Sequence, residues 1–248
     1  MARVRIGRGV VVRPGPTARV VDLPAGDADV VGGYRRIDNI TDATLEQYHQ
    51  WYGDVVTKDA IFSFAYGLLH SPDYRERFAA DLKRTLPRIP RIDAADFGAF
   101  ADAGQRLLDL HIDYEDAALY PLTVTGDRPT GPGFADLYGW FRVEKLKWKS
   151  KGDKSAIVYN PRITISGIPE GAHRYMLGSR SALEWILDRY QVKTDKASGI
   201  VNDPNDWSCE VGNPRYILDL IAKVTTVSVE TMKIVDALPP LRIVEEKQ

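Results

Sequence analysis

The chain has 248 residues, of which 44% are hydrophobic and one is cysteine, and its formal net charge is −1. This is the composition of a globular protein with enough apolar residues for a packed core, and a single cysteine excludes an internal disulfide framework and a cysteine-based zinc site. No apolar run approaches the roughly 18 residues of a membrane span, and no apolar signal segment follows the basic N-terminus, so we expect a cytoplasmic protein with no membrane partner.

The N-terminal half is predicted to consist of an arm and a helical subdomain. Residues 1–33 alternate short β-branched runs with proline and glycine, which predicts short strands or an irregular arm. Residues 34–120 carry helical periodicity, and Thr41, Thr57 and Ser71 stand where N-cap residues are expected. We expect helices over residues 41–51, 57–70, 71–86 and 93–114. The second is apolar on nearly its whole circumference, so we expect it to be buried.

Residues 121–241 are predicted to form a β-rich part. The chain becomes rich in proline, glycine and threonine after Tyr120. Two strand-like runs follow, Phe141–Trp148 and Ser155–Ile168, and the polar connection around Gly152 suits a hairpin turn. The apolar positions of the first run slip from one face to the other, which predicts a bulge.

The clearest helix signal begins at Ser181. Ser181 and Glu184 stand three residues apart, as in a capping box. Apolar residues then recur at the spacing of one buried helix face: Leu183, Ile186, Leu187 and Tyr190. The polar run at residues 191–207 predicts a long loop, a type of segment that often carries function. We expect a last long helix over residues 213–237 and a tail at residues 242–248.

These elements predict an α+β fold. A helical layer supports a part that contains a β-hairpin, and the long C-terminal helix closes the domain.

The basic residues are concentrated in two segments, although the net charge is close to zero. Residues 142–154 and residues 75–91 each carry a local charge of +4, so the remainder of the chain carries −9. Such segregation is typical of a nucleic-acid-binding surface, but it also fits an ordinary solvated face.

The common catalytic motifs do not occur in this sequence. The chain has no GxxxxGK(S/T) phosphate loop, no GxGxxG after a strand, no GxSxG elbow and no HExxH pair. The four histidines show no metal-ligand spacing. We therefore expect no catalytic residue, no metal site and no enzyme activity by this chain alone.

Two long segments resemble a known family. AYGLLHSPDYRERFAADLKRTLPRIP (Ala65–Pro90) and RSALEWILDRYQVKTDKASGIVNDPNDW (Arg180–Trp207) are similar to the C-terminal target-recognition domain, or specificity domain, of type ISP restriction–modification enzymes. These enzymes resemble the adenine-N6 methyltransferases of the type IIG and Eco57I-like group. Shorter matches, such as RVEKLKW at Arg142–Trp148, extend the resemblance over about residues 34–241.

The resemblance implies a role in reading DNA. In the family, one polypeptide carries a nuclease, a helicase-like ATPase, an S-adenosylmethionine-dependent methyltransferase and then this domain, which reads an asymmetric DNA target. The (D/N/S)PP(Y/F) methyltransferase motif is missing here, and Asn160-Pro161-Arg162 does not replace it. The resemblance therefore implies S-adenosylmethionine, ATP and Mg²⁺ only for a parent enzyme, and no cofactor for this chain.

The candidate DNA-binding residues are cations and amides of three segments. The lysines of the hairpin suit phosphate contact or entry of a β-ribbon into the major groove, and those of the loop suit base-edge contact because lysine pairs with guanine and asparagine with adenine. The set is Lys145, Lys147, Lys149, Lys151, Lys154, Arg180, Lys193, Lys196, Asn202, Asn205, Arg88 and Arg91. The alternative interpretations are a lysine-protected edge hairpin and a loop whose amides bind their own backbone.

We expect sequence-specific binding of double-stranded DNA, with a target adenine positioned for a separate methyltransferase domain. The expected partners are duplex DNA and the methyltransferase and helicase–nuclease domains of a parent enzyme. One alternative is a docking module that binds an acidic protein surface and has no DNA affinity of its own. Another is a small hydrolase built from scattered carboxylates, which a deep pocket with convergent carboxylates would favour.

Overall fold

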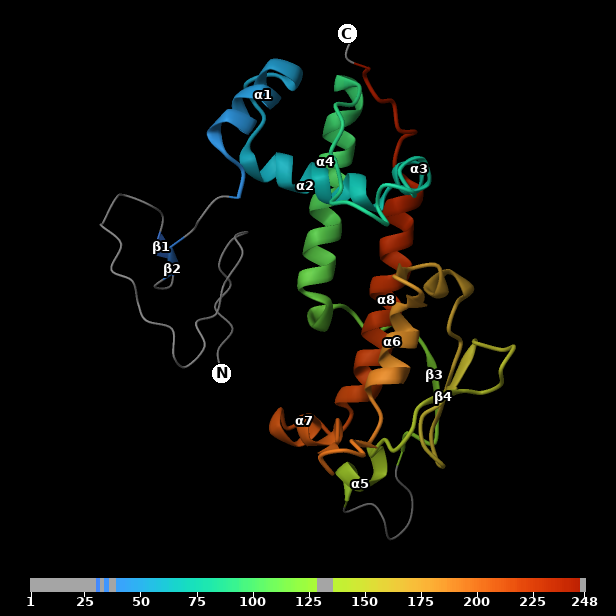
Figure 1. The fold of residues 1–248 in the computed structure, drawn as a ribbon. Helices are drawn as coiled ribbons and strands as arrows, with labels where there is room; N and C mark the ends of the chain where they lie inside the picture. Colours follow the sequence, from blue (N-terminus) through green and yellow to red (C-terminus); the bar gives the residue numbers. More distant parts are fainter. Residues whose placement is uncertain (1–29, 32–33, 36–38, 129–135, 246–248) are drawn as a thin grey trace. The chain divides into compact units, whose positions relative to one another are not determined.

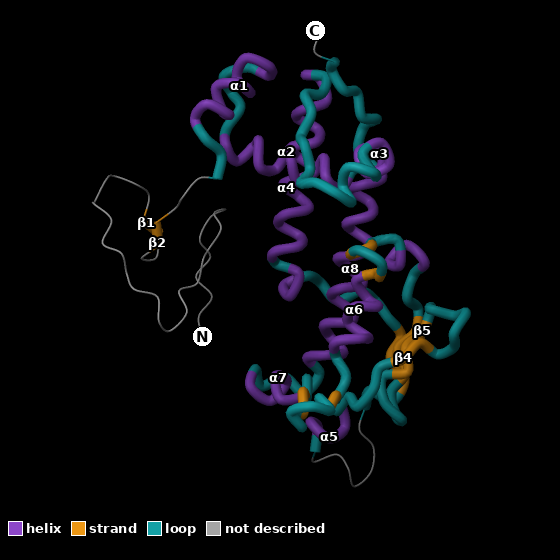
Figure 2. The backbone as a smooth tube through the Cα atoms, viewed as in Figure 1, coloured by secondary structure: helices purple, strands orange, loops and turns teal. Residues whose placement is uncertain are grey.

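The computed structural model describes residues 30–31, 34–35, 39–128 and 136–245. Its helices and small antiparallel sheets make an α+β fold with a long C-terminal helix, as predicted (Figures 1 and 2). The described residues form two compact units, one of residues up to 105 together with 239–245, the other Arg106–Leu238. Along the chain, the division between these units falls within helix α4 (Ala94–Ile112), and the division of function that the sequence places after residue 120 stays a prediction.

Of the predicted N-terminal arm, only one strand falls within the described residues. β1 (Val30–Val31) pairs with β2 (Tyr34–Arg35) in an antiparallel arrangement. The rest of residues 1–33 lies outside the part of the chain that the structure describes.

The helices of the first unit begin at the predicted caps. The side chain of Thr41 accepts a hydrogen bond from the backbone of α1 (Asp42–Tyr52), and Thr57 does the same for α2 (Lys58–His70). Ser71 caps α3 (Pro72–Arg77), with proline in the first turn. The signal for each helix start lies within a few residues, because each cap side chain accepts a hydrogen bond from the N–H group three residues ahead.

Two predictions for this unit are wrong. The third helix ends at Arg77 instead of 86, and Leu86 is 87% exposed, so the predicted apolar stripe has no packing to hold a helix there. The second helix is not buried all round, because Phe62 is 44% exposed while Ile61, Phe64 and Leu68 are buried.

Aromatic rings and a close helix crossing form the core of this unit. Tyr52 and Phe97 stack with ring centroids 4.3 Å apart, and Phe64 packs against Phe97 at 4.9 Å. Helices α2 and α4 approach at Gly67 and Gly104, where an added Cβ would lie 2.3 Å from Phe100 O and 1.7 Å from Ser63 O, respectively. Only residues without a side chain allow the two backbones this close.

The end of the chain is bound to the first unit. Ile243 pairs with Ile92 in an antiparallel bridge, and Asp93 N donates to Arg242 O at 2.8 Å. The guanidinium of Arg242 donates two hydrogen bonds of 2.7 Å to the buried carboxylate of Asp96. The sequence assigned residues 242–244 to a tail. In the structure they are bound to the first unit by backbone hydrogen bonds and by the side chain of Arg242.

Replacing Asp96 by asparagine should destabilise the first unit in a pH-dependent manner. The hydrogen bonds from Arg242 hold the pKa of Asp96 below its ordinary value. A depressed pKa adds stability that is present above the unfolded-state pKa and is lost as the pH falls through the folded-state pKa. We expect the variant to melt about 2–4 °C lower at pH 7, with the difference vanishing in acid. Thermal melts from pH 7 to pH 3 measure this, and Asp102→Asn, at an exposed position of α4, should change nothing.

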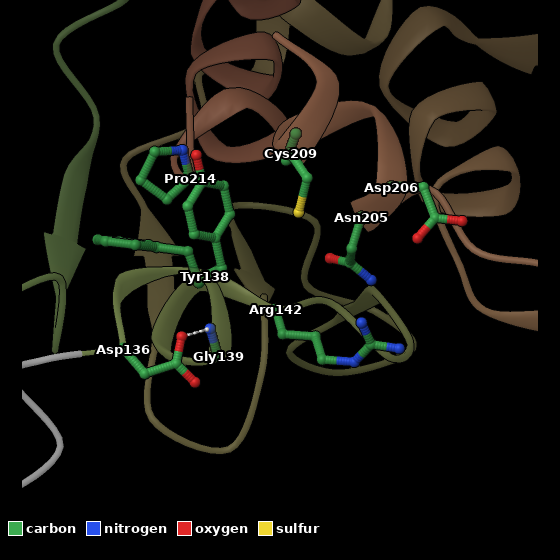
Figure 3. Close-up of a pocket in the computed structure, with 10 residues that line it drawn as sticks. Asp136, Tyr138, Gly139, Arg142, Asn205, Asp206, Cys209 and Pro214 are labelled. Atoms are coloured by element: carbon green, nitrogen blue, oxygen red, sulfur yellow. Dashed lines mark hydrogen bonds between the residues drawn. The ribbon is translucent and has the colours of Figure 1, made fainter. Parts of the chain in front are cut away.

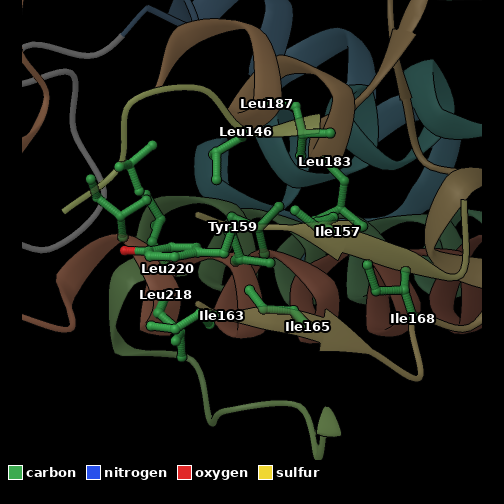
Figure 4. Close-up of a cluster of buried hydrophobic side chains, with 14 of the residues drawn as sticks. Leu146, Ile157, Tyr159, Ile163, Ile165, Ile168, Leu183, Leu187, Leu218 and Leu220 are labelled. Carbon is green, nitrogen blue, oxygen red and sulfur yellow. The ribbon is translucent and has the colours of Figure 1, made fainter. Parts of the chain in front are cut away.

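The second unit is built on a four-stranded antiparallel sheet. Its order is β3-β6-β5-β4, from β3 (Thr123–Thr125), β6 (Thr164–Ser166), β5 (Ala156–Val158) and β4 (Lys147–Trp148). Helices α6 (Ala182–Arg189) and α8 (Tyr216–Asp236) pack against each other (Figure 1). Buried aliphatic residues of the sheet and both helices form one core, among them Ile157, Ile163, Ile165, Leu183 and Leu218 (Figure 4).

The predicted pair of long strands is wrong in detail. Phe141 ends a short helix, α5 (Leu137–Phe141), and only residues 147–148 of the first run are in a strand. Phe141, Val143 and Leu146 are all buried, so the slip in phase marks an irregular segment. The second run forms two strands, β5 and β6, because the side chain of Asn160 accepts hydrogen bonds from the N–H groups of residues 162 and 163 and turns the chain.

The helices of the second unit follow the sequence closely. Ser181 and Glu184 form the predicted capping box of α6, with Ser181 N donating to Glu184 Oε2 at 2.8 Å. Helix α8 begins three residues after Asn213 and ends next to Ala237. The other elements among the described residues are 3-10 turns at Tyr114–Asp116 and Glu170–His173, β7 (Met176–Leu177), β8 (Arg180–Ser181), β9 (Lys193–Thr194), β10 (Val201–Asn202) and α7 (Asn205–Glu210).

Candidate nucleic-acid interface

The segment between α5 and β4 is clamped by one asparagine from 62 residues further along. Asn205 Oδ1 accepts from Val143 N at 2.8 Å, and Asn205 Nδ2 donates to Val143 O at 2.7 Å. The amide thereby makes the two hydrogen bonds that a paired strand would make. Asn205 is 8% exposed and its polar atoms are engaged, so we leave it out of the proposed base-reading residues.

A carboxylate beside this clamp anchors it further. Asp203 Oδ1 accepts from the backbone N of Asn205 at 2.9 Å and from its Nδ2 at 2.6 Å, while Arg142 forms an ion pair with Asp203. Burial raises the pKa of Asp203, but the hydrogen bonds from Asn205 and Arg142 outweigh burial and hold the pKa below its ordinary value. The carboxylate is therefore charged at neutral pH and holds Arg142 and Asn205 together.

Backbone pairing joins the same segment to the residues after α6. Val192 N donates to Glu144 O at 2.9 Å, and Lys145 and Gln191 form an antiparallel bridge. We call residues 142–145, 191–192, 203 and 205 the root. Because the bridge is antiparallel, the chain leaves the root in opposite directions towards β4 and towards β9.

The first element that leaves the root is the lysine hairpin of β4, β5 and the connection between them. Lys149 N donates to Ala156 O at 2.9 Å, and the Asp153 side chain closes the turn by accepting from Ser155 N at 2.9 Å. Four of the predicted lysines are exposed on this hairpin or at its entry: Lys145, Lys147, Lys149 and Lys151. Lys154 differs, because its Nζ pairs with Glu184 Oε1 at 2.7 Å and ties the hairpin to α6.

The predicted loop after α6 forms a second hairpin. β9 and β10 pair with Val201 opposite Thr194 and Asn202 opposite Lys193. Asp195 Oδ1 accepts hydrogen bonds from Ser198 N at 2.7 Å and Ala197 N at 3.0 Å, and Gly199 has a φ of +72°, so the tip is locally determined. Lys196 and Asn202 are exposed on this hairpin.

Two further predicted cations belong to a cluster on α6. Lys193 Nζ donates to Asp188 O at 2.7 Å, and Arg180 lies 3.1 Å from the Asp188 carboxylate. Both side chains remain about half exposed. Their charge is thus available at the surface of the second unit.

Arg88 and Arg91 belong to the first unit. Arg88 is exposed, and its carbonyl accepts from Tyr74 OH at 2.7 Å. The guanidinium of Arg91 lies 5.6 Å from the centre of the Trp51 ring. Their role in DNA binding stays a prediction.

A shallow pocket of about 290 Å³ lies beside the root (Figure 3). Its wall is formed by residues of α5, of α7 and of the segment after α5, including Tyr138, Arg142, Asn205, Asp206 and Cys209. Arg142 and Asn205 are the residues that hold the root, so this wall is part of the scaffold. Among the residues that the structure describes, no group of three or more histidine, cysteine, aspartate or glutamate side chains is arranged to hold a metal ion.

Comparison with known proteins identifies the family. The model of the type ISP C-terminal specificity domain matches residues 15–220. The chain belongs to this family. The match starts earlier and ends earlier than the resemblance predicted over residues 34–241, so the specificity domain includes part of the segment before residue 34.

Three solved structures agree with this membership. A nuclease-deletion mutant of the type ISP restriction–modification enzyme LlaGI, in complex with a DNA substrate mimic, is 42% identical with a TM-score of 0.67 over 77% of this chain. The ATP-dependent type ISP enzyme LlaBIII bound to DNA is 35% identical with a TM-score of 0.69 over 80%. A DrdV–DNA complex is 36% identical with a TM-score of 0.68 over 83%.

This specificity domain corresponds to a small part of those chains. It spans 17% of the LlaGI chain, 12% of the LlaBIII chain and 20% of the DrdV chain. The search of curated proteins gave no match. No helix in the described ranges is long and apolar enough to cross a membrane.

The sequence named Lys145 and Asn205 as DNA-binding candidates, but it did not indicate which residues pair with one another to build the root. Arg142 was seen only as part of a basic run, and Asp203 only as part of a polar loop. The run of asparagine and aspartate at residues 202–206 suggested self-contained turns, and two of its members do bond each other. Nothing local pointed to Val143 as the other partner.

Proposed function

We propose that this specificity domain binds duplex DNA in a sequence-specific manner, as the target-recognition module of a type ISP restriction–modification enzyme. Membership of the specificity-domain family supports this, as do the three similar structures that contain DNA or a DNA mimic. In this proposal the domain holds the duplex so that a target adenine reaches a separate methyltransferase domain.

The observation that carries the proposal is the shared root of two exposed hairpins. The bridge between Lys145 and Gln191 sends the lysine hairpin and the β9–β10 hairpin away from each other. In this proposal the cations of both hairpins contact the same duplex, because a rod-like polyanion can reach two hairpins that leave one root in opposite directions, whereas a point-like acidic ligand cannot. Arg142, Asp203 and Asn205 fix this arrangement by side-chain bonds.

The two hairpins differ in what they can contribute. The lysine hairpin offers several exposed ammonium groups, so we assign to it phosphate contacts and most of the affinity. The β9–β10 hairpin carries Lys196 and Asn202 on a two-stranded ribbon of a size that the major groove admits. We assign base contacts to that ribbon, since lysine and asparagine match the edges of guanine and adenine.

The other activities belong to the parent enzyme in this proposal. S-adenosylmethionine serves its methyltransferase domain, and ATP and Mg²⁺ serve its helicase–nuclease part. These domains are the protein partners of the specificity domain, and the assembly acts on cytoplasmic DNA. The specificity domain itself provides recognition and no catalytic group.

Replacing Lys147, Lys149 and Lys151 together by alanine should reduce the salt dependence of DNA binding. Each phosphate contact adds about 0.9 to the slope of log K against log salt, so we expect the slope to fall by at most roughly three units. Fluorescence anisotropy with a random-sequence duplex at 50–200 mM KCl measures this slope. Lys233→Ala serves as the control, because that exposed lysine of α8 already pairs with Glu230 at 2.8 Å.

Two outcomes would contradict parts of this proposal. If the slope of log K against log salt is unchanged in the triple variant, the lysine hairpin does not contact DNA phosphates. A wild-type chain that binds no duplex at low salt, and shows no preference after selection from a random pool, removes DNA recognition and favours the docking module instead.

A further inference from the structure

The outer face of α6 carries an indole ring that contacts two guanidinium groups. The centre of the Trp185 ring lies 5.2 Å from the guanidinium carbon of Arg180 and 5.4 Å from that of Arg189. The ring is fixed in place, because Trp185 Nε1 donates to Leu177 O at 2.9 Å. Trp185 thus orders two arginines that would otherwise be flexible, at distances typical of cation–π contacts.

The charges on this face do not balance. Asp188 lies 3.1 Å from Arg180 and 3.3 Å from Lys193 Nζ. Within the described residues, no ion pair of Arg189 is found, and the nearby Glu184 already binds Lys154 and the cap of the helix. Arg180 and Lys193 therefore share one carboxylate and Arg189 adds a third cation, which leaves a local excess of two positive charges at the surface.

Such an arrangement suits a phosphate group. Arginine presents its N–H groups in a planar fork that matches phosphate oxygens, and a guanidinium stacked on a ring loses less conformational entropy when it binds. Two cations that share one carboxylate also gain from a further anion, because the anion relieves their mutual repulsion. The side chain of Lys193 connects this face to the β9–β10 hairpin, for which we propose base contacts.

We propose that Arg180, Arg189 and Lys193, ordered by Trp185, bind a backbone phosphate of the DNA beside the β9–β10 hairpin. We call these four residues the α6 cation face. This inference rests on the proposed DNA binding and adds a phosphate site to it. Arg189 is the cation that does not pair with Asp188, so its guanidinium makes the main phosphate contact. Trp185 is a positioning residue. The helix thus serves both as scaffold, through its buried side, and as a DNA contact, through its outer side.

Replacing Arg189 by alanine should weaken binding to target and random duplexes by the same factor. We expect a roughly 5- to 10-fold loss of affinity at moderate salt and a salt slope smaller by about 0.9, because a phosphate contact carries no sequence information. Arg174→Ala is the matched control, since that exposed arginine is already neutralised by Asp236 through hydrogen bonds of 2.8 and 2.6 Å. Its affinity and slope should match the wild type.

The role of Trp185 is tested by a pair of variants. Trp185→Leu should weaken binding several-fold, and Trp185→Phe should restore most of the loss because a flat ring remains under both guanidinium groups. Thermal melts of both variants show whether α6 is still folded. Equal loss in the two variants would mean that the ring does not position the arginines.

The results separate this inference from the proposed function. If Arg189→Ala binds like the wild type while the triple lysine variant loses slope, the α6 cation face is not a phosphate site and DNA binding stands. If the wild-type chain binds no duplex, both proposals are wrong. A loss in Arg189→Ala that affects only the target duplex would also overturn the phosphate assignment and indicate base contact.

Discussion

Replacing Gly104 by alanine should disrupt the first unit of this specificity domain. A Cβ at this position would lie 1.7 Å from Ser63 O and 2.7 Å from Gly67 N, both of which are backbone atoms of α2. Backbone atoms cannot move aside as a flexible side chain does, so the two helices must separate. Overpacking a core usually costs 1–3 kcal/mol, and a clash of this kind lies above that range, so we expect more than about 3 kcal/mol.

Thermal or urea denaturation of the Gly104→Ala variant measures this effect. A loss of about 3 kcal/mol corresponds to a fall in Tm of roughly 6–12 °C for a chain of this size. Gly98→Ala is the matched control, because Gly98 lies in the same helix and an added Cβ would meet nothing within 4 Å. That variant should be more stable by about 0.5–1 kcal/mol, since alanine favours a helix over glycine. If both variants behaved alike, the close crossing of α2 and α4 would be incorrect.

The helix starts could be predicted because their signals are local. Thr41, Thr57, Ser71 and Ser181 each bond an N–H group within the next turn, so three or four residues of sequence contain the whole interaction. The same glycines that allow the helix crossing carried no readable signal. From the sequence alone, a glycine inside a predicted helix indicates only lower helix stability. The close approach that it allows is evident only when the position of the partner helix is known.

The root could not be predicted because its partners are far apart in sequence. Val143 looked like one position of a strand with a bulge, whereas its backbone is bound by the Asn205 side chain from 62 residues away. The segment around Val143 forms neither a regular strand nor a helix, so its buried side chains follow neither period. Its backbone pairs with the side chain of Asn205 and with residues 191–192 after α6. Sequence periodicity predicts helices and strands, and it does not predict contacts between a backbone and a distant side chain.

Two members of the α6 cation face were named from the sequence. Arg180 and Lys193 were candidate DNA-binding residues because of their charge. Arg189 and Trp185 were not among the candidates, although a spacing of four residues places them on one face of a helix. Only the tertiary fold shows that the Trp185 ring also lies beside Arg180, which belongs to β8 before the helix.

Replacing Asn205 by alanine should both destabilise the second unit and weaken DNA binding. The change leaves Val143 N and Val143 O, which are buried, without the partners they have now. Each unsatisfied buried group costs about 1–3 kcal/mol, so for these two groups we expect a loss of roughly 2–6 kcal/mol in the free energy of unfolding. The root then no longer fixes the two hairpins relative to each other, and target affinity should fall more than random-sequence affinity.

Asn205→Asp sharpens this test through its pH dependence. The introduced carboxylate still accepts from Val143 N, but it loses the donor to Val143 O and faces the carboxylate of Asp203, which now accepts the amide at 2.6 Å. Repulsion should raise the pKa of the introduced group above its unfolded value, so protonation favours the folded state and the variant should regain stability as the pH falls. This direction is opposite to that expected for Asp96.

Asn202→Ala provides the control that separates stability from recognition. Asn202 is exposed on β10, only three residues from Asn205, so its loss should leave the free energy of unfolding within about 0.5 kcal/mol of the wild type. It should nevertheless reduce the preference for target over random DNA. Urea denaturation and anisotropy on the same three variants give both quantities. If Asn205→Ala kept wild-type stability, the side-chain clamp on Val143 would not be what holds the hairpins, and the arrangement of the interface would have to rest on the pairing of residues 144–145 with 191–192 alone.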